Sequence, residues 1–289
     1  MKIKKEADTL TIEISPEKFF KSITSSKRKK RKNKRKSKQN KKRIYILDEI
    51  RGTAVIAMVI YHFLFSSGYV FKNSTAYDIF KSIRPVEPII AVTFIFVAGI
   101  CTKLSRSNLK RGCILFAIAL AVNIITEIFM PNIAIRFGVI NLLSVCMILY
   151  GLLEKFIKKI KPLWGLISSL LIFILTWGLN HRYIGLFGYE LFELPDLLYQ
   201  TDFLYPLGFR NASFSSGDYF PLFPWIFMFM SGSNFAQMYD GKTLPKKYYK
   251  QHSSMLSKAG QYSLLIYILH QPIIFAVLYV VEYLQKLCQ

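Results

Sequence analysis

Charged residues are scarce in this sequence, and cysteines are few. Charged side chains make up 19% of the 289 residues, below the roughly 25% that is usual in soluble domains. The four cysteines form neither a CxxC pair nor a Cys/His spacing of the zinc type. The composition therefore argues against a soluble domain, and we expect no disulfide framework and no metal site.

Motifs of soluble nucleotide-using enzymes and of exported proteins are also absent. The sequence contains neither GxxxxGK[ST] nor GxGxxG, so neither ATP hydrolysis nor a Rossmann cofactor is indicated. No apolar run follows the charged residues at the N-terminus, as a cleavable signal peptide would require. We therefore expect the N-terminal segment to remain on the mature protein.

Apolar residues dominate the rest of the chain. They make up 52% of it, and the mean hydropathy is +0.30 although residues 1–43 are strongly basic. These 43 residues hold eighteen of the 39 Lys and Arg but four of the 17 Asp and Glu, and so carry +14 of the net charge of +22. The remainder is too apolar to present a polar surface to water. We predict a membrane protein with a basic cytoplasmic tail, 1–43, and a transmembrane domain, 44–289.

Seven apolar runs approach the roughly 20 residues that cross the hydrocarbon core. Lipid offers no partner to a bare peptide group, so each run must be a helix, and the alternation typical of barrel strands is absent. The predicted fold class is all-α, a polytopic helical bundle with about seven transmembrane helices. The runs are 44–71, 86–104, 112–130, 138–153, 163–180, 219–238 and 263–284.

Basic residues between the runs fall mainly on one side of the membrane. The loops on the side of the tail hold thirteen Lys and Arg, against seven on the other side, which also carries an acidic loop. Because cytoplasmic loops are enriched in Lys and Arg, we place the N-terminus in the cytoplasm and the C-terminus outside, in the plasma membrane.

The segment 27–43 has thirteen basic residues in seventeen and no apolar residue. Such a segment cannot bury a core, so we predict a disordered arm. Its expected partner is anionic lipid, with about 1 kcal/mol for each charge near the surface. Nucleic-acid binding is the alternative. Because no aromatic residue interleaves the run, we expect no nucleic-acid partner.

Ionisable residues inside the first run need a reason to be there, since a charge at mid-bilayer costs roughly 2.5 to 3.5 kcal/mol. Asp48 and Arg51 are three residues apart and His62 is eleven beyond Arg51, so all three share one helix face. A rise of 1.5 Å per residue places His62 about 16 Å deeper than Arg51. An acid and a base along one route favour Asp48 and His62 as catalytic groups. In the alternative, Asp48 pairs with Arg51 at the interface and His62 bonds a neighbouring helix.

Other polar residues gather in the expected outer half. Glu127 lies near the end of the third run, Asn141 lies in the first turn of the fourth, and Asp218 precedes the sixth. His270 comes shortly before Pro272 in the last run, where proline frees a carbonyl and permits a kink. These four polar residues are candidates for contacting a substrate or supporting the groups that do.

Several blocks are weak signals singly and a specific signal together. They are LDEIRGTAVIAMVIYHF, FIFVAGICTKLSR, IRFGVINLLSVCMILYG, FSSGDYFPLFPW and SLLIYILHQPIIF. In these blocks the sequence resembles bacterial membrane proteins grouped with the catalytic domain of heparan-α-glucosaminide N-acetyltransferase, a lysosomal enzyme that acetylates a terminal glucosamine across a membrane. The blocks occur in the family's order and span nearly everything after the tail.

The resemblance implies a multi-span acyltransferase that moves an acetyl group from cytoplasmic acetyl-CoA to an amine or hydroxyl on the far side. The acceptor would be a cell-envelope glycan or a lipid-linked amine, and an oligomer is compatible with the family. The phosphates of the co-substrate would meet the basic cytoplasmic loops and Arg51. His62 would take the proton of the acceptor or carry the acetyl group briefly.

One departure from the family pattern concerns His62. In the lysosomal branch an asparagine occupies its place, and the catalytic histidine follows eleven residues later, where this chain has Asn73. The two residue types are therefore swapped. The resemblance implies that His62 is the base and that Asn73 holds the substrate or the oxyanion.

Two other classes of function fit the same polar residues. A proton-coupled transporter would use a midplane histidine, an intramembrane acid and proline-interrupted helices, although no inverted repeat is visible between the halves of the chain. A noncatalytic membrane scaffold would use the basic arm to recruit lipid or a partner. Transfer of labelled acetyl that depends on His62 separates the enzyme from both.

Overall fold

A computed structural model describes residues 43–186, 188–239 and 244–287. The chain divides into the units Met1–Arg43 and Ile44–Gln289, and nearly all of the described residues belong to the second unit. The predicted disordered arm lies outside the described residues, apart from Arg43.

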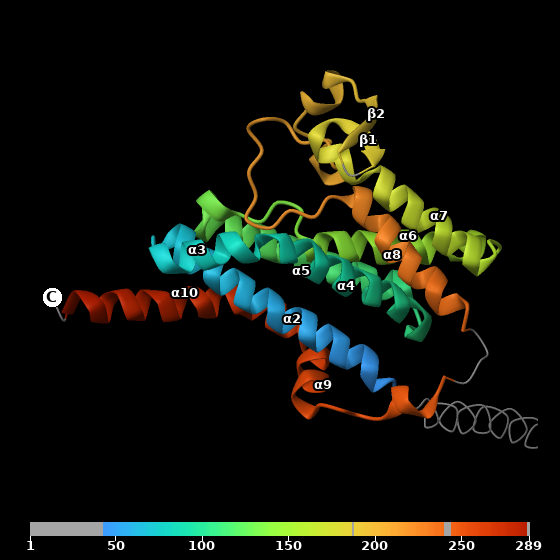
Figure 1. Cartoon of the computed structure of the whole chain (residues 1–289), viewed down its shortest axis with the longest axis horizontal. Coiled ribbons are helices and arrows are strands. Elements are labelled where there is room, and N and C mark those ends of the chain that lie inside the picture. The colour runs from blue at the N-terminus through green and yellow to red at the C-terminus, as the bar shows by residue number, and fades with distance from the viewer. Residues whose placement is uncertain (1–42, 187, 240–243, 288–289) are drawn as a thin grey trace, which may run out of the picture. The chain divides into compact units, whose positions relative to one another are not determined.

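The described unit is almost entirely helical (Figure 1). Short 3-10 or π segments join or extend several of the α-helices. The helices are α2 (Tyr45–Phe65), α3 (Ser74–Ile83), α4 (Glu87–Ile100), α5 (Asn108–Phe129), α6 (Val139–Ile157), α7 (Pro162–Leu175), α8 (Leu222–Gln237), α9 (Ser254–Gln261) and α10 (Ser263–Leu287). The strands are β1 (Tyr183–Leu186) and β2 (Tyr189–Glu193).

The predicted membrane bundle is confirmed. In the described ranges, six helical stretches are long and apolar enough to cross a membrane. The seventh predicted run corresponds to α8, which has 16 residues. The six stretches are Tyr45–Val70, Ser74–Leu104, Asn108–Phe129, Val139–Ile157, Pro162–His181 and Ser263–Leu287.

Helices α3, α6 and α9 differ most from the sequence prediction, and α9, like α3, lies between the predicted runs. Helix α3 occupies a stretch that was expected to be a loop. The Asn73 side chain caps its first turn. Helix α6 runs beyond the predicted residue 153, and its last turns carry the ion pair between Glu154 and Lys158 at 2.5 Å. Apolar runs alone therefore do not predict helices, or ends of helices, that contain polar residues.

Glycines set the closest helix crossings. A Cβ on Gly52 of α2 would lie 1.9 Å from the Leu256 carbonyl oxygen of α9. A Cβ on Gly99 of α4 would lie 2.0 Å from the Phe229 oxygen of α8, and one on Gly232 would lie 2.0 Å from the Phe96 oxygen. Such crossings bring helix backbones into contact, which is how helices associate in lipid, where burial of apolar surface provides little driving force.

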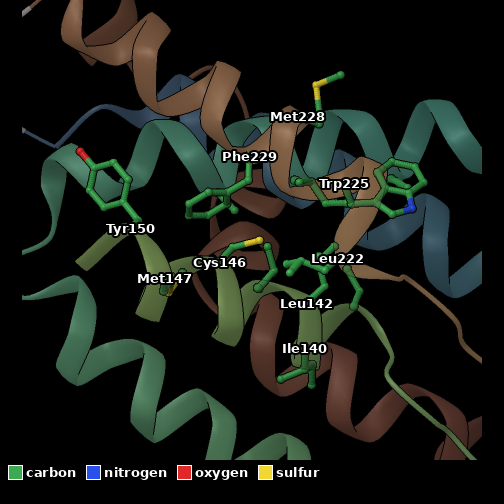
Figure 2. Close-up of a cluster of buried hydrophobic side chains, with 14 of the residues drawn as sticks. Ile140, Leu142, Cys146, Met147, Tyr150, Leu222, Trp225, Met228 and Phe229 are labelled. Atoms are coloured by element: carbon green, nitrogen blue, oxygen red, sulfur yellow. The ribbon is translucent and has the colours of Figure 1, made fainter. Parts of the chain in front are cut away.

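The centre of the bundle is filled mainly from α6 and α8. Figure 2 shows their side chains gathered in one cluster, and Leu142 and Phe229 have no exposed surface. Trp225 of α8 packs against Phe173 of α7 with ring centroids 5.7 Å apart. This cluster fixes the position of α6, whose first turn borders the site described below.

A long irregular segment separates α7 from α8. It begins with the antiparallel hairpin β1–β2, which lies beyond the end of α7 (Figure 1). Tyr199 anchors the segment, because its hydroxyl donates to the Leu179 carbonyl at 2.5 Å and its ring is buried. The end of the segment, residues 210–220, returns to the bundle and covers one side of the main cavity.

Candidate active site

A cavity of about 550 Å³ lies between α2, α4 and α10 and the segment before α8. Its wall is part apolar and part polar. The polar lining residues are Tyr61, His62, Tyr69, Arg84, Glu87, Asn180, Arg210, Ser216, Asp218, Tyr219 and Tyr267. Two of the predicted site residues, His62 and Asp218, therefore line the same cavity although 156 positions of sequence separate them.

His62 lies near the far end of α2. At 1.5 Å per residue it stands about 26 Å from the start of the helix at Tyr45. Its ring centroid is 5.7 Å from that of Tyr61 and 4.9 Å from that of His270. The imidazole thus faces the cavity on one side and a second histidine from α10 on the other.

His270 is buried behind His62. Its Nδ1 lies 2.6 Å from the Tyr267 carbonyl oxygen, and because a carbonyl only accepts, Nδ1 must carry the proton. Its Nε2 is then an acceptor, and no partner for this buried atom occurs among the described residues. The predicted His270 candidate therefore supports the site through its contact with His62 and does not line the cavity itself.

Asp218 joins three elements at the cavity wall. Its Oδ2 accepts the Val139 N–H at 3.0 Å, at the first turn of α6, and the Tyr267 hydroxyl donates to the same oxygen. Gly138 permits this approach, since a Cβ there would lie 2.4 Å from Oδ2. Burial raises the pKa of Asp218 and outweighs the two hydrogen bonds, which favour the charged form.

A second tyrosine–carboxylate pair lines the same cavity. The Tyr61 hydroxyl donates to Glu87, which stands in the first turn of α4. Both tyrosine side chains are buried, and both carboxylates line the cavity. The His62 ring therefore lies among hydroxyl and carboxyl groups whose hydrogen bonds hold them in place.

Asp48 and Arg51 do not reach the cavity. Asp48 is buried in the first turn of α2, where its backbone packs against Gly260. Arg51 donates from Nη2 to the Ser263 hydroxyl at 2.6 Å, at the start of α10. The sequence predicts that Asp48, Arg51 and His62 share one helix face. Asp48 and Arg51 lie near the start of α2, whereas His62 lies near its end.

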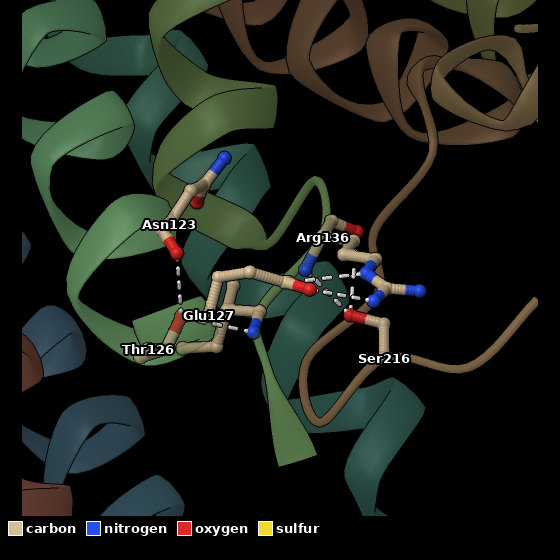
Figure 3. Close-up of polar contacts among 6 residues, drawn as sticks. Asn123, Thr126, Glu127, Arg136 and Ser216 are labelled. Atoms are coloured by element: carbon tan, nitrogen blue, oxygen red, sulfur yellow. Dashed lines mark hydrogen bonds and ion pairs between the residues drawn. The ribbon is translucent and has the colours of Figure 1, made fainter. Parts of the chain in front are cut away.

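Three other candidates stabilise local structure. Asn73 Oδ1 accepts the Ala76 N–H at 2.9 Å, and Asn141 Oδ1 accepts the Gly138 N–H at 3.2 Å. Glu127 forms an exposed ion pair with Arg136 at 2.8 Å, and Figure 3 shows Ser216 beside Arg136, whose backbone N–H donates to the Ser216 hydroxyl. The structure does not bring Asn73, Asn141 or Glu127 into the cavity.

Sequence reasoning missed several polar lining residues. Tyr267 lies one helical turn before His270, and Tyr61 is adjacent to His62, so helical spacing could have identified both. Glu87 is an acid in the first turn of the second predicted run. Arg84 and Arg210 were counted only as loop charges, because no local pattern shows that residues 126 positions apart line one cavity.

The cavity can accommodate proton-transfer chemistry on a small polar substrate. The His62 imidazole lines the cavity and can act as a general base toward a bound substrate, and the Tyr61 and Tyr267 hydroxyls beside it are held by the carboxylates to which they donate. In the described part of the chain, no group of three or more His, Cys, Asp or Glu could hold a metal ion.

Comparison with known proteins gives a match to a family model. No curated protein and no solved structure matches the chain. The model of the family described as heparan-alpha-glucosaminide N-acetyltransferase, catalytic, matches residues 43–272, which include the whole cavity and every predicted site residue. The chain belongs to this family and is a multi-pass membrane acetyltransferase.

Proposed function

We propose that this protein transfers an acetyl group from acetyl-CoA to an amine or hydroxyl of a glycan or lipid-linked acceptor on the opposite side of the membrane. The observation that supports this best is the position of His62. A histidine near the far end of a membrane-spanning helix borders a partly polar cavity that is large enough for a sugar-sized group. The family match supplies the type of reaction.

In this proposal His62 acts as the general base. The acceptor nitrogen or oxygen attacks the thioester carbonyl, its proton passes to the His62 ring, and the new C–N or C–O bond replaces the C–S bond. The proton then goes from the imidazolium to the departing CoA thiolate, so no other reactant is needed. The contact with His270 supports the His62 ring, and the Tyr61 and Tyr267 side chains line the same cavity.

The donor would approach from the side of the basic loops, which we propose is the cytoplasmic side. Arg51 lies at that end of α2, and Lys and Arg are concentrated in the loops there. The thioester of acetyl-CoA is at the end of a long flexible arm. Its phosphates can therefore bind near Arg51 while its acetyl group reaches the level of His62, about 16 Å along the helix.

Acetyl transfer into sealed vesicles tests this proposal. The purified full-length protein is reconstituted, glucosamine is trapped inside at high concentration, and acetyl-labelled CoA is added outside. Since acetyl-CoA does not cross lipid, we expect label on the trapped sugar only when the protein is present. Label that stays outside would contradict transfer across the membrane, and sugar movement without acetylation would favour a transporter.

A further inference from the structure

We propose that the acceptor carries an anionic group, such as a phosphate, which Arg84 and Arg210 bind at the mouth of the cavity. This inference rests on the proposed function and specifies its acceptor class. Both arginines line the cavity and both are exposed, whereas Tyr61 and Tyr267, which also line it, are buried. The cavity therefore has a cationic mouth above a hydrogen-bonded interior.

Arg84 and Arg210 differ from the arginines that lie outside the cavity at the same end of the bundle. Arg136 pairs with Glu127 at 2.8 Å, and Arg182 pairs with Asp196 at 2.6 Å. By contrast, neither Arg84 nor Arg210 forms an ion pair with any residue in the described ranges. Among the described arginines on this side of the bundle, those without an acidic partner are thus the two that line the cavity.

The carboxylates of the cavity do not pair with the two arginines. Glu87 accepts the Tyr61 hydroxyl, and Asp218 accepts the Tyr267 hydroxyl and the Val139 N–H. Arg84 is near enough to Glu87 to attract it, but the two side chains form no ion pair. The carboxylates are therefore held by neutral donors, and the guanidinium groups remain available to a ligand.

The geometry of the two arginines suits an anion. Arg210 lies over the Tyr219 ring at 6.0 Å, an arrangement that supports the guanidinium through its face and leaves its N–H groups free at the edge. Arg84 comes from the 3-10 segment Arg84–Val86 before α4, and Arg210 from the segment before α8. A planar guanidinium binds phosphate or carboxylate with two parallel hydrogen bonds, so two of them from separate segments define a specific subsite.

Phosphate could also come from the donor, because CoA is itself phosphorylated. The two sources are separated by steady-state kinetics of the purified protein in nanodiscs, with acetyl-CoA as donor and either glucosamine or glucosamine 6-phosphate as acceptor. We expect the KM of the phosphorylated probe to be about tenfold lower than that of glucosamine. Arg84→Gln and Arg210→Gln should each raise that KM about tenfold, with little change in kcat and in the KM for acetyl-CoA.

Arg182→Gln is the matched control, since it removes an exposed arginine that already has an acidic partner; its kinetics should equal those of the wild type. Equal KM values for the two probes would overturn the proposal. A rise in the KM for acetyl-CoA instead of that for the acceptor would assign the arginines to the donor and would also overturn it.

Direct binding separates this proposal from the proposed function. The thermal shift caused by glucosamine 6-phosphate, measured without acetyl-CoA, does not depend on catalysis. A shift that Arg84→Gln abolishes and Arg182→Gln retains would establish the anion site even if no acetyl transfer were found. If transfer occurs but the phosphorylated sugar gives no larger shift than glucosamine, the anion site is wrong and the proposed function stands.

Discussion

Asp218 shows how one side chain can serve both the fold and the cavity. Its carboxyl accepts a backbone N–H at the start of α6 and a hydroxyl from α10, so it joins two helices to the segment before α8. The N-terminus of a helix has unsatisfied N–H groups, and a side-chain acceptor there is worth about 0.5 to 2 kcal/mol. At the residue scale, the cavity wall is thus stabilised by groups that also face its interior.

Substitution of Asp218 separates its charge from its hydrogen bonds. Asp218→Ala should lower the free energy of unfolding by about 0.5 to 2 kcal/mol, because the Val139 N–H loses its acceptor. Asp218→Asn keeps an acceptor oxygen and should cost less. Thermal unfolding in detergent at fixed pH measures both, and equal losses for the two variants would contradict a capping role.

The pH dependence of the same variants has a definite sign. Because burial raises the pKa of Asp218, the folded protein holds this proton more tightly than the unfolded chain does. Stability due to this group is therefore present at low pH and is lost as the pH rises through the raised pKa. Asparagine has no proton to lose, so Asp218→Asn should flatten the dependence of the melting temperature on pH over that range.

At the scale of elements, backbone contact between helices determines the arrangement of the bundle. Gly99 and Gly232 place α4 and α8 against each other, and Gly52 does the same for α2 and α9. A larger side chain at such a crossing has no free volume, because the opposing atom is a backbone oxygen that cannot rotate away. The site depends on these crossings, since α2 and α4 both line the cavity.

Gly232→Val tests this dependence. The new Cβ would lie 2.0 Å from the Phe96 oxygen, so α4 and α8 must separate, and we expect a loss of about 1 to 3 kcal/mol or more. Ala117→Val on the exposed face of α5 adds apolar volume at an open position and should change stability little. Melting temperatures in the same detergent compare the two; a stable Gly232→Val protein would refute close packing at this crossing.

At the scale of the whole molecule, the sequence predicted the membrane bundle and part of the site for identifiable reasons. Apolar runs of the required length identify spans because lipid demands them, and His62 and Asp218 stood out as polar residues within or beside such runs. Helix α3 was missed because it is short and amphipathic.

Tertiary contacts account for the rest of the site. Asn73 matched the family pattern only with the two residue types swapped, yet its amide caps a helix, a role that depends on where that helix begins. Arg84 and Arg210 line one cavity because the long segment before α8 returns to the bundle, and local patterns do not specify that return. Sequence thus indicated individual polar residues, and the fold determines which of them share a cavity.

The central claim is that acetyl transfer depends on His62 at the cavity. The most direct test is the single-turnover rate of acetyl transfer from acetyl-CoA by purified His62→Ala, with His181→Ala as the control. His181 is exposed and does not line the main cavity, so its loss should leave the rate unchanged. We predict that His62→Ala lowers the rate by about 10²-fold or more, as expected for loss of a general base. A folded His62→Ala protein that transfers acetyl at the rate of the wild type would contradict the account.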